Sequence, residues 1–393
     1  MGQRHVVLRS RRASTGDVFL GPMAGTRGVD PTVADVTVDV EDVDRRGVRS
    51  LARGADVVAV APVIPMKLIE PLDAPAQPAA PGATWGVTAV GADTSPFTGS
   101  GVVVAVLDTG IDATHPAFTG VTLVQEDFTG EGNGDQHGHG THCAGTIFGR
   151  PLGGTRIGVA PGVTRALVGK VIGTQGGSSE SIVRAIQWAA DKGAHVISMS
   201  LGMDFPGLVA QLQGEGYPPE LATSLALEGY RANVQLFERL ASLVRALGGF
   251  QQATVTVAAA GNESQRDVNP DFEIAVSPPA VAEGVISVAA LGQTPQGLKV
   301  ADFSNTGANL SGPGVGVFSA WKNGGTRTIS GTSMATPHVA GAAALWAENI
   351  MTMGPLTGLQ LTSRLIASAT FAGLAPGFDP TDVGAGLVRA PQA

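Results

Sequence analysis

The sequence has few of the features that mark disulfide-bonded, membrane-spanning or nucleic-acid-binding proteins. A single cysteine excludes any disulfide within the chain. No apolar run is long enough to cross a membrane, and the first residues lack the apolar core of a secretory signal. The net charge of −8 includes no basic block. We therefore expect no membrane and no nucleic-acid partner, and a cytoplasmic location unless a signal has been trimmed.

Glycine and apolar residues dominate what is present, with 55 glycines and 43% hydrophobic residues in a chain of 393. This length accommodates one large α/β domain and a smaller one. From residue 85 onward, strand-like and helix-like patterns alternate, which predicts a doubly wound, mostly parallel sheet with helices on both faces. The predicted strands are 102–107, 122–127, 165–171, 196–200, 254–259 and 285–290, and the predicted helices are 139–148, 178–192 and 332–347.

Ser333 lies at the start of the last of these helices, which has no charged residue before Glu348. Pro337 is compatible with a helix start, because first-turn amides have no partner within the helix. These free amides and the helix dipole favour a developing negative charge. The position therefore suits a nucleophile.

Three other polar residues complete a site around this serine. Asp108 ends the first predicted strand, His139 lies in a glycine-rich loop, and Asn262 follows the fifth predicted strand. Ligands bind at the carboxyl ends of strands in such sheets, so we expect these residues to converge. We interpret Ser333 as nucleophile, His139 as general base, Asp108 as its orienting carboxylate and Asn262 as an oxyanion donor.

With these residues the chain resembles the subtilisin-like serine peptidases, the subtilases. Four sequences match in order, namely Asp-Thr-Gly at 108–110, His-Gly-Thr-His at 139–142, Ala-Gly-Asn at 260–262 and Gly-Thr-Ser-Met-Ala-Thr-Pro-His at 331–338. The resemblance implies a serine endopeptidase that binds an extended peptide or protein segment between two strands. The substrate-binding residues predicted from it are Gly176, Gly177, Ser200, Leu201, Gly202, Ala259 and Gly261.

Residues 1–70 are expected to form a small α+β unit that resembles the inhibitory pro-region of subtilases. Alternating patterns predict strands at 5–9, 33–40 and 56–61 and a charged helix at 41–53. An unrelated small domain is the alternative.

A linker rich in proline and alanine at 71–83 would join this unit to the catalytic domain at 84–393. Residues 63–70 would then lie in the active-site cleft as an intramolecular inhibitor. We expect the chain to cut itself between Met66 and Leu72.

Residues 203–251 depart from the resemblance, because the family core needs only one helix there. A Pro-Pro-Glu start signal and helical spacing at 221–247 predict a long surface helix packed on the core. The alternative makes residues 203–217 a lid or a partner surface beside the cleft.

No cofactor and no metal is expected. At the calcium site that the resemblance implies, Ala117 replaces an acidic ligand and the partner loop carries Arg150 and Arg156. Three nearby acids are interpreted as a solvated loop, with a weak calcium site as the alternative; they are Asp127, Glu131 and Asp135.

Other chemistries fit parts of the sequence. An aspartic protease needs a second Asp-Thr-Gly, which only a dimer would supply. A zinc hydrolase would use His137, His139 and His142, but Thr141 replaces the acid that such a site carries before its last histidine. Two further alternatives keep the serine chemistry: a peptide ligase or macrocyclase, and a latent protease activated when a partner removes the pro-region.

Overall fold

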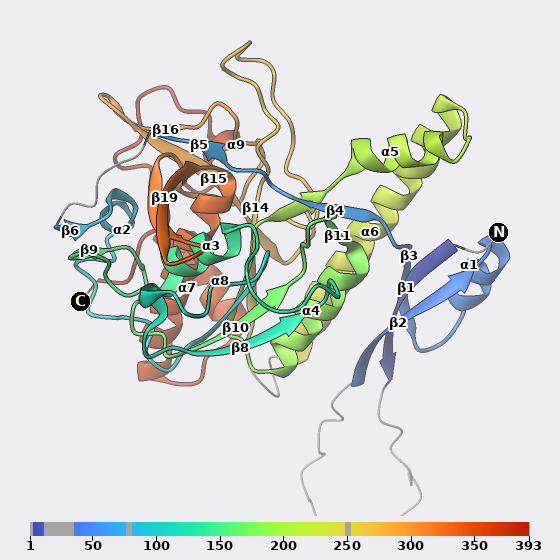
Figure 1. The fold of residues 1–393 in the computed structure, drawn as a ribbon, viewed down its shortest axis with the longest axis horizontal. Coiled ribbons are helices and arrows are strands. Elements are labelled where there is room, and N and C mark those ends of the chain that lie inside the picture. The colour runs from blue at the N-terminus through green and yellow to red at the C-terminus, as the bar shows by residue number, and fades with distance from the viewer. Residues whose placement is uncertain (1–2, 12–34, 76–80, 248–252, 393) are drawn as a thin grey trace, which may run out of the picture.

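The computed structural model describes residues 3–11, 35–75, 81–247 and 253–392 (Figure 1). Its central strands are β7 (Val103–Asp108), β8 (Thr122–Asp127), β10 (Arg165–Lys170), β12 (Val196–Met199), β14 (Val255–Ala259) and β15 (Val285–Thr294). These run parallel in the order β15-β14-β12-β7-β10-β8. At the β15 end, β16 (Gly297–Val300) pairs antiparallel and β17 (Leu310–Pro313) pairs parallel. The predicted doubly wound, mostly parallel sheet is confirmed, and each predicted strand coincides with an observed one.

Alternate residues of β7 face two helical layers. Val104 and Val106 pack in one apolar cluster with α3 (His139–Phe148) and α7 (Thr332–Met353). Ala105 and Leu107 pack in a second cluster with α4 (Ser179–Asp191). Both faces of the sheet are thus covered, which explains why its strands are continuous apolar runs.

Helix α7 continues six residues beyond its predicted end at residue 347. Its first charged residue, Glu348, does not end the helix, because the carboxylate accepts hydrogen bonds from the amides of residues 98–100. Within the described residues, no helix has both the length and the apolar character needed to cross a bilayer. The remaining elements of this region are α2 (Trp85–Ala89), the 3-10 helix η1 (Pro116–Phe118), β9 (Thr155–Arg156), β18 (Val317–Trp321), β19 (Gly325–Ser330), α8 (Gly358–Ser368) and α9 (Pro380–Val383).

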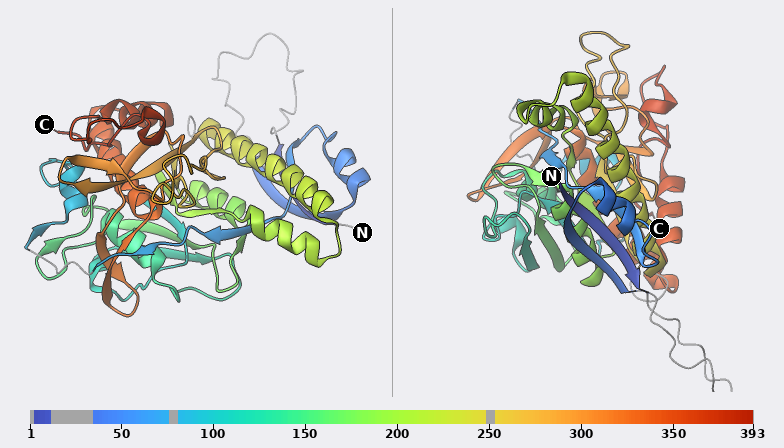
Figure 2. Two further views of the ribbon diagram at one scale, coloured as in Figure 1. Left: turned by 90° about the horizontal axis from the view of Figure 1, so that it is seen from above. Right: turned by 90° about the vertical axis from the view of Figure 1, so that its right-hand side faces the viewer.

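The amino-terminal residues form a separate antiparallel sheet at one end of the molecule (Figures 1 and 2). Its order is β2-β1-β3, from β1 (Gln3–Arg11), β2 (Asp35–Val43) and β3 (Val57–Pro62), with α1 (Arg45–Leu51) between the last two. Helix α1 is shorter than predicted, because Glu41 still belongs to β2 and pairs with Arg9 of β1. Asp44 then caps α1 through the amides of residues 46 and 47. Residues 33–34 of the predicted strand lie outside the described residues.

After β3 the chain crosses the main domain as an extended segment. Strand β4 (Pro65–Leu68) lies between β11 (Gly177–Ser178) and β13 (Leu201–Met203) and is antiparallel to both. Further on, β5 (Leu72–Asp73) pairs with β19, and β6 (Gly82–Ala83) pairs with β9. The two ends of the predicted linker are therefore paired strands, and its residues 76–80 lie outside the described residues.

The predicted long helix in the insert is present as α6 (Pro219–Leu247), and a second helix, α5 (Phe205–Gly214), precedes it. Helix α6 packs against α4, α5 and β3, so it touches both the main domain and the amino-terminal sheet (Figure 2). Residues 248–251 of the predicted insert lie outside the described residues.

Candidate active site

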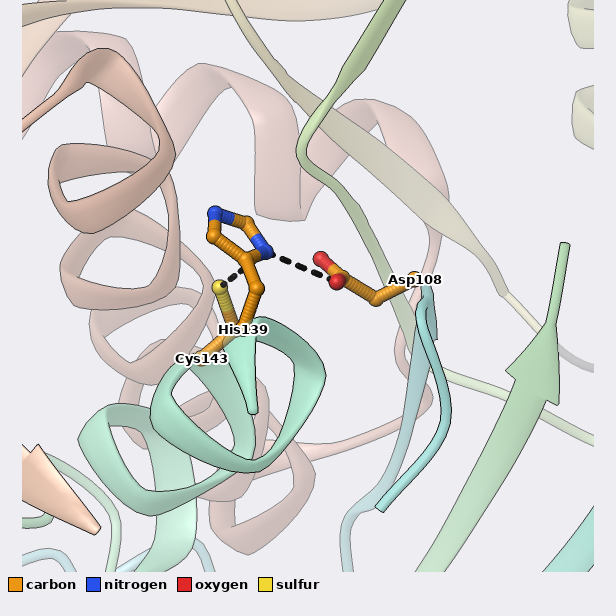
Figure 3. A group of neighbouring side chains, drawn as sticks. All are labelled: Asp108, His139 and Cys143. Atoms are coloured by element: carbon orange, nitrogen blue, oxygen red, sulfur yellow. Dashed lines mark hydrogen bonds and ion pairs between the residues drawn. The ribbon is translucent and has the colours of Figure 1, made fainter. Parts of the chain in front are cut away.

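Asp108 and His139 form a buried hydrogen-bonded pair (Figure 3). The apolar run of β7 carries Asp108 to the carboxyl end of a central strand, and α3 begins at His139. Nδ1 of His139 lies 2.7 Å from Oδ1 of Asp108, and their side chains are 0% and 1% exposed. The same carboxylate oxygen accepts the amide of Thr109 at 2.8 Å. Asp108 therefore fixes both the ring orientation and the tautomer of His139.

The Asp108 carboxylate stabilises the positive charge that His139 acquires when it takes up a proton. Burial lowers the pKa of His139, but Asp108 and then Cys143 raise it by more, so this pKa lies well above its usual value. Cys143 lies one turn along α3, with Sγ 3.8 Å from Nδ1 of His139. Burial raises the pKa of the Cys143 thiol, which keeps it neutral. Asp108 is therefore the anion positioned to stabilise the imidazolium that forms when His139 takes up a proton.

Asp135 holds the two halves of this pair together. One carboxylate oxygen accepts from Thr109 Oγ1 at 2.9 Å and from the amides of His137 and Gly138. The other accepts from the amide and hydroxyl of Thr141, at 2.9 and 2.6 Å. Asp135 thus ties the residue after Asp108 to the first turn of α3. The interpretation of Asp135 as solvated was wrong, and the sequence carried no signal that separates it from the other acids of this glycine-rich loop.

Ser333 and Asn262 form the second half of the site. The amide and hydroxyl of Thr332 donate to Oδ1 of Asn262 at 2.9 and 2.8 Å. This leaves Nδ2 of Asn262 directed into the cleft, where it donates to the Glu70 carbonyl at 3.0 Å. Thr332 was not predicted from the sequence, although its position directly before Ser333 was a cue.

The two halves meet at the segment that crosses the cleft. Ser333 is fully buried, and its hydroxyl donates to the carbonyl of Ile69 at 3.2 Å. Nε2 of His139 has no hydrogen-bond partner among the described residues. The serine hydroxyl is thus engaged by the bound segment, and the ring nitrogen expected to accept its proton is available.

Most of the predicted substrate-binding residues contact this segment. Gly177 pairs with Met66, Leu201 with Leu68 and Gly202 with Lys67. Gly176 has a φ of 84°, and its backbone lies so close to the segment that a Cβ there would be 3.1 Å from the Met66 carbonyl oxygen.

The other predicted residues, Ser200, Gly261 and Ala259, lie behind the serine and do not pair with the segment in the described part of the chain. Ser200 donates to the Ser333 carbonyl at 3.3 Å, and the amide of Gly261 donates to Thr332 at 3.2 Å. Ala259 is buried within β14 and pairs with Val288 of β15.

Two arginines occupy the loop where the calcium site was considered. Arg150 donates to the carbonyls of Phe148, Pro161 and Val163. Arg156 donates to the carbonyls of residues 158 and 159 at 3.1 and 2.9 Å. The guanidinium groups therefore use backbone oxygens of the kind that a cation would need.

The three acidic residues near His139 do not converge on one point. Asp127 accepts from Thr129 and the amide of Gly132 within its own loop. Glu131 binds Thr174 and lies 3.1 Å from Nζ of Lys170, whereas Asp135 holds α3 as described. The alternative of a shared weak calcium site among them has no geometric support.

The histidines at 137, 139 and 142 do not share a metal site either. Nε2 of His142 lies 3.1 and 3.2 Å from the carbonyl oxygens of Val317 and Arg327. Burial, followed by the proximity of His139, lowers the pKa of His142 to about 3, so its ring is a neutral structural donor. Within the described ranges, the one cluster of three possible ligands is Asp108, His139 and Cys143. The arrangement fits proton transfer from a serine to His139 better than binding of zinc.

Comparison with known proteins gives concordant matches. The family profile described as the subtilase family matches residues 99–386. Subtilisin Savinase of Lederbergia lenta is 33% identical over 319 residues, which cover 79% of this chain and 97% of that protein. Subtilisin DY of Bacillus licheniformis is 32% identical over 304 residues, covering 76% of this chain and 92% of the relative. A thermostable alkaline protease of Halalkalibacterium halodurans is 34% identical over 318 residues, covering 79% and 73%. Nothing in these names favours a cytoplasmic location, which stays a prediction.

Proposed function

Because the chain belongs to the subtilase family of serine proteases, we propose that Ser333, His139 and Asp108 cleave peptide bonds through an acyl-enzyme. The observation that carries the proposal is the contact of two groups with one extended segment, because Ser333 and Asn262 each donate to one of its carbonyls. His139 lies near Ser333 on its Asp108 anchor, since Cys143 Sγ is 3.8 Å from Nδ1 of His139 and 3.4 Å from the Ser333 carbonyl oxygen.

The proposed reaction begins when the Ser333 hydroxyl turns from the carbonyl oxygen to Nε2 of His139. The histidine takes the proton as Oγ attacks the carbonyl carbon, and Asp108 stabilises the imidazolium. Nδ2 of Asn262 and the Ser333 amide then stabilise the oxyanion. His139 returns the proton to the departing nitrogen, and water releases the acyl group by the same steps.

Residues 1–70 would act as an intramolecular inhibitor, with β4 filling the cleft in place of substrate. Within that segment, Ile69 is buried, and a Cβ added at Gly202 would lie 3.5 Å from its side chain. The Ile69 carbonyl is the one that Ser333 contacts, which favours the Ile69–Glu70 bond as the processing site. The next bond is a poor alternative, since Pro71 supplies a crowded tertiary nitrogen as leaving group.

A latent protease is a second candidate, favoured by one specific contact. Asn262 donates to the carbonyl of Glu70 rather than that of Ile69, so no single carbonyl receives both groups. Processing would require a shift by one residue, which a partner that displaces the amino-terminal sheet would promote. In that case wild-type protein would remain full-length and inactive until the partner or a nick near residue 75 releases it.

The test is active-site labelling combined with product analysis. We expect a fluorophosphonate to modify Ser333 and abolish peptide cleavage, whereas pepstatin and zinc chelators leave it intact. Ser333→Ala should stay at full length, while wild type yields a new amino terminus at Glu70. Mass spectrometry of the peptide products separates hydrolysis from ligation, because a ligase joins the acyl group to an added amine. Activity that persists after complete labelling of Ser333 would contradict the assignment.

A further inference from the structure

The segment bound in the cleft continues upstream onto the insert. Ile64 exchanges two hydrogen bonds with Ser179 at the start of α4: its amide donates to Oγ, and its carbonyl accepts the Ser179 amide. The Pro65 carbonyl accepts the amide of Asp204, and the Pro62 carbonyl accepts Nδ2 of Asn233 at 2.9 Å. Both Asp204 and Asn233 belong to the insert. Backbone recognition therefore extends past β4 to Pro62.

Buried and half-buried side chains alternate along residues 64–68 of this segment. Ile64, Met66 and Leu68 are 1%, 2% and 5% exposed, whereas the residues between them are half-buried. Ile64 packs where α6 has a glycine. A Cβ added at Gly229 would lie 3.6 Å from Ile64 Cγ2, 3.5 Å from Pro62 Cγ and 3.8 Å from Leu208 Cδ2. A Cβ alone would make ordinary contacts at these distances, so only a larger side chain would push the strand away from the insert.

Asn233 is an unusual residue to find inside this contact. Its side chain is completely buried in α6, and its amide also donates to the Gly229 carbonyl at 3.0 Å. Its Oδ1 has no partner among the described residues, so an unsatisfied polar atom lies beside the backbone of the segment. A buried, half-satisfied amide is costly, and an apolar residue would suit a purely structural helix better.

We propose that the insert is a second part of the substrate-binding site, which takes the backbone of an extended polypeptide upstream of the cleft. The proposal rests on the proposed proteolytic function, since the occupant seen in the structure is the chain's own amino-terminal region. A substrate chain replaces it, with apolar residues at the positions of Ile64, Met66 and Leu68. Asn233 binds the carbonyl at the position of Pro62, and its free Oδ1 accepts from the substrate or from water. The preferred substrates are long unfolded segments or exposed loops rather than short peptides.

The first test compares peptide lengths on the full chain after its own processing is complete. Two internally quenched peptides carry the chain's own residues 66–74 and 60–74, and a third carries the longer sequence with aspartate at the position of Ile64. We expect kcat/KM for the long peptide to exceed that for the short one by about tenfold, mainly through KM, as expected for one hydrogen bond and a buried aliphatic side chain. The aspartate peptide should behave like the short one.

The second test uses variants of the insert. Asn233→Leu and Gly229→Met should remove most of the advantage of the long peptide and leave kcat/KM for the short peptide unchanged. Gly214→Met is the matched control, because a Cβ at Gly214 of α5 would meet nothing within 4 Å. If Gly229→Met does not fold, Asn233→Leu and the wild-type comparison still decide the matter.

The outcomes separate this inference from the proposed function. Equal kcat/KM for short and long peptides in wild type would overturn the inference and leave proteolysis intact. An advantage that survives both variants would overturn the assignment to the insert. Failure of wild type to cleave any of the peptides would instead contradict the proposed function.

Discussion

Replacing Asp135 with alanine should lower both stability and activity, although Asp135 takes no part in the proposed proton transfers. The change removes the acceptor for five hydrogen bonds from Thr109, His137, Gly138 and Thr141. These bonds join the end of β7 to the first turn of α3. Without them, this junction keeps the hydrogen bond between His139 and Asp108 and the one from the Gly140 amide to Thr109 Oγ1.

The magnitude follows from which donors can reach water. Thr109 and Thr141 are 4% and 0% exposed, so two hydroxyls and one amide are stranded in a buried place. Each unsatisfied buried donor costs about 1–3 kcal/mol, and the donor at residue 137 lies nearer to solvent. We expect a loss of about 3–5 kcal/mol in the free energy of unfolding. Displacement of His139 by about 1 Å would lower kcat by up to about 10²-fold.

Urea unfolding in the Ser333→Ala background measures the stability without self-digestion. Asp127→Ala is the matched control, because among the described residues the hydrogen bonds of Asp127 stay within its own loop, and it should change stability by less than about 1 kcal/mol. Asp135→Asn should fall between them, since a carboxamide can serve one set of donors but presents hydrogens to the other. If Asp135→Ala unfolds within about 1 kcal/mol of its parent, the role assigned to this residue is wrong.

Three further predictions concern pH, thiol reagents and calcium. Burial lowers the pKa of His195 to about 4, so between about pH 6.5 and pH 4 the unfolded state binds more protons at this residue than the folded state. The free energy of unfolding is therefore unaffected by His195 above about pH 6.5 and falls as the pH decreases toward 4. His195→Gln should therefore reduce the acid-induced loss in urea unfolding by on the order of 2–3 kcal/mol, and an unchanged loss would contradict this. Cys143→Ala should keep most activity and lose sensitivity to mercurials, which act by displacing His139 from Asp108; a folded but inactive variant would refute the steric explanation. The melting temperature of Ser333→Ala should be the same in millimolar calcium as in EDTA. Arg150 and Arg156 already donate to backbone carbonyls, those of Val163 and Gly158, that a calcium site there would use. A stabilisation of ~2.7 kcal/mol, expected at 100 times Kd, would show a site after all.

The central strands and helix α3 follow local patterns of apolar and turn residues, and the sequence predicted them well. The apolar strands are long and buried on both faces, so their bounds and the polar residues at their ends, Asp108 and Asn262, could be placed without a structure. Parallel topology then brought those ends to one edge. Helix α3 was predicted residue for residue because glycines and histidine mark its start.

Long-range pairing set the limit. Asp135 looks like any acid in a glycine-rich loop, and only the fold brings Thr109 and Thr141 to it. Helical spacing located α6 but gave no information about which residues would lie against it. The contact of Gly229 and Asn233 with residues far upstream depends on how the amino-terminal sheet docks, for which a single sequence carries no periodic signal.

The hydrogen bonds of Thr332 determine which of its two flipped orientations the Asn262 side-chain amide adopts. A side-chain amide is nearly the same shape in its two flipped forms, yet one form offers a donor to the cleft and the other offers an acceptor that would repel an oxyanion. Two donors from Thr332 to Oδ1 make these forms unequal, since the flipped amide would set hydrogens against hydrogens. Removing the hydroxyl in Thr332→Val leaves only the backbone amide to choose between them. Selection of the correct face is thus completed by the residue next to Ser333 before any substrate arrives, and it does not have to be made during the reaction.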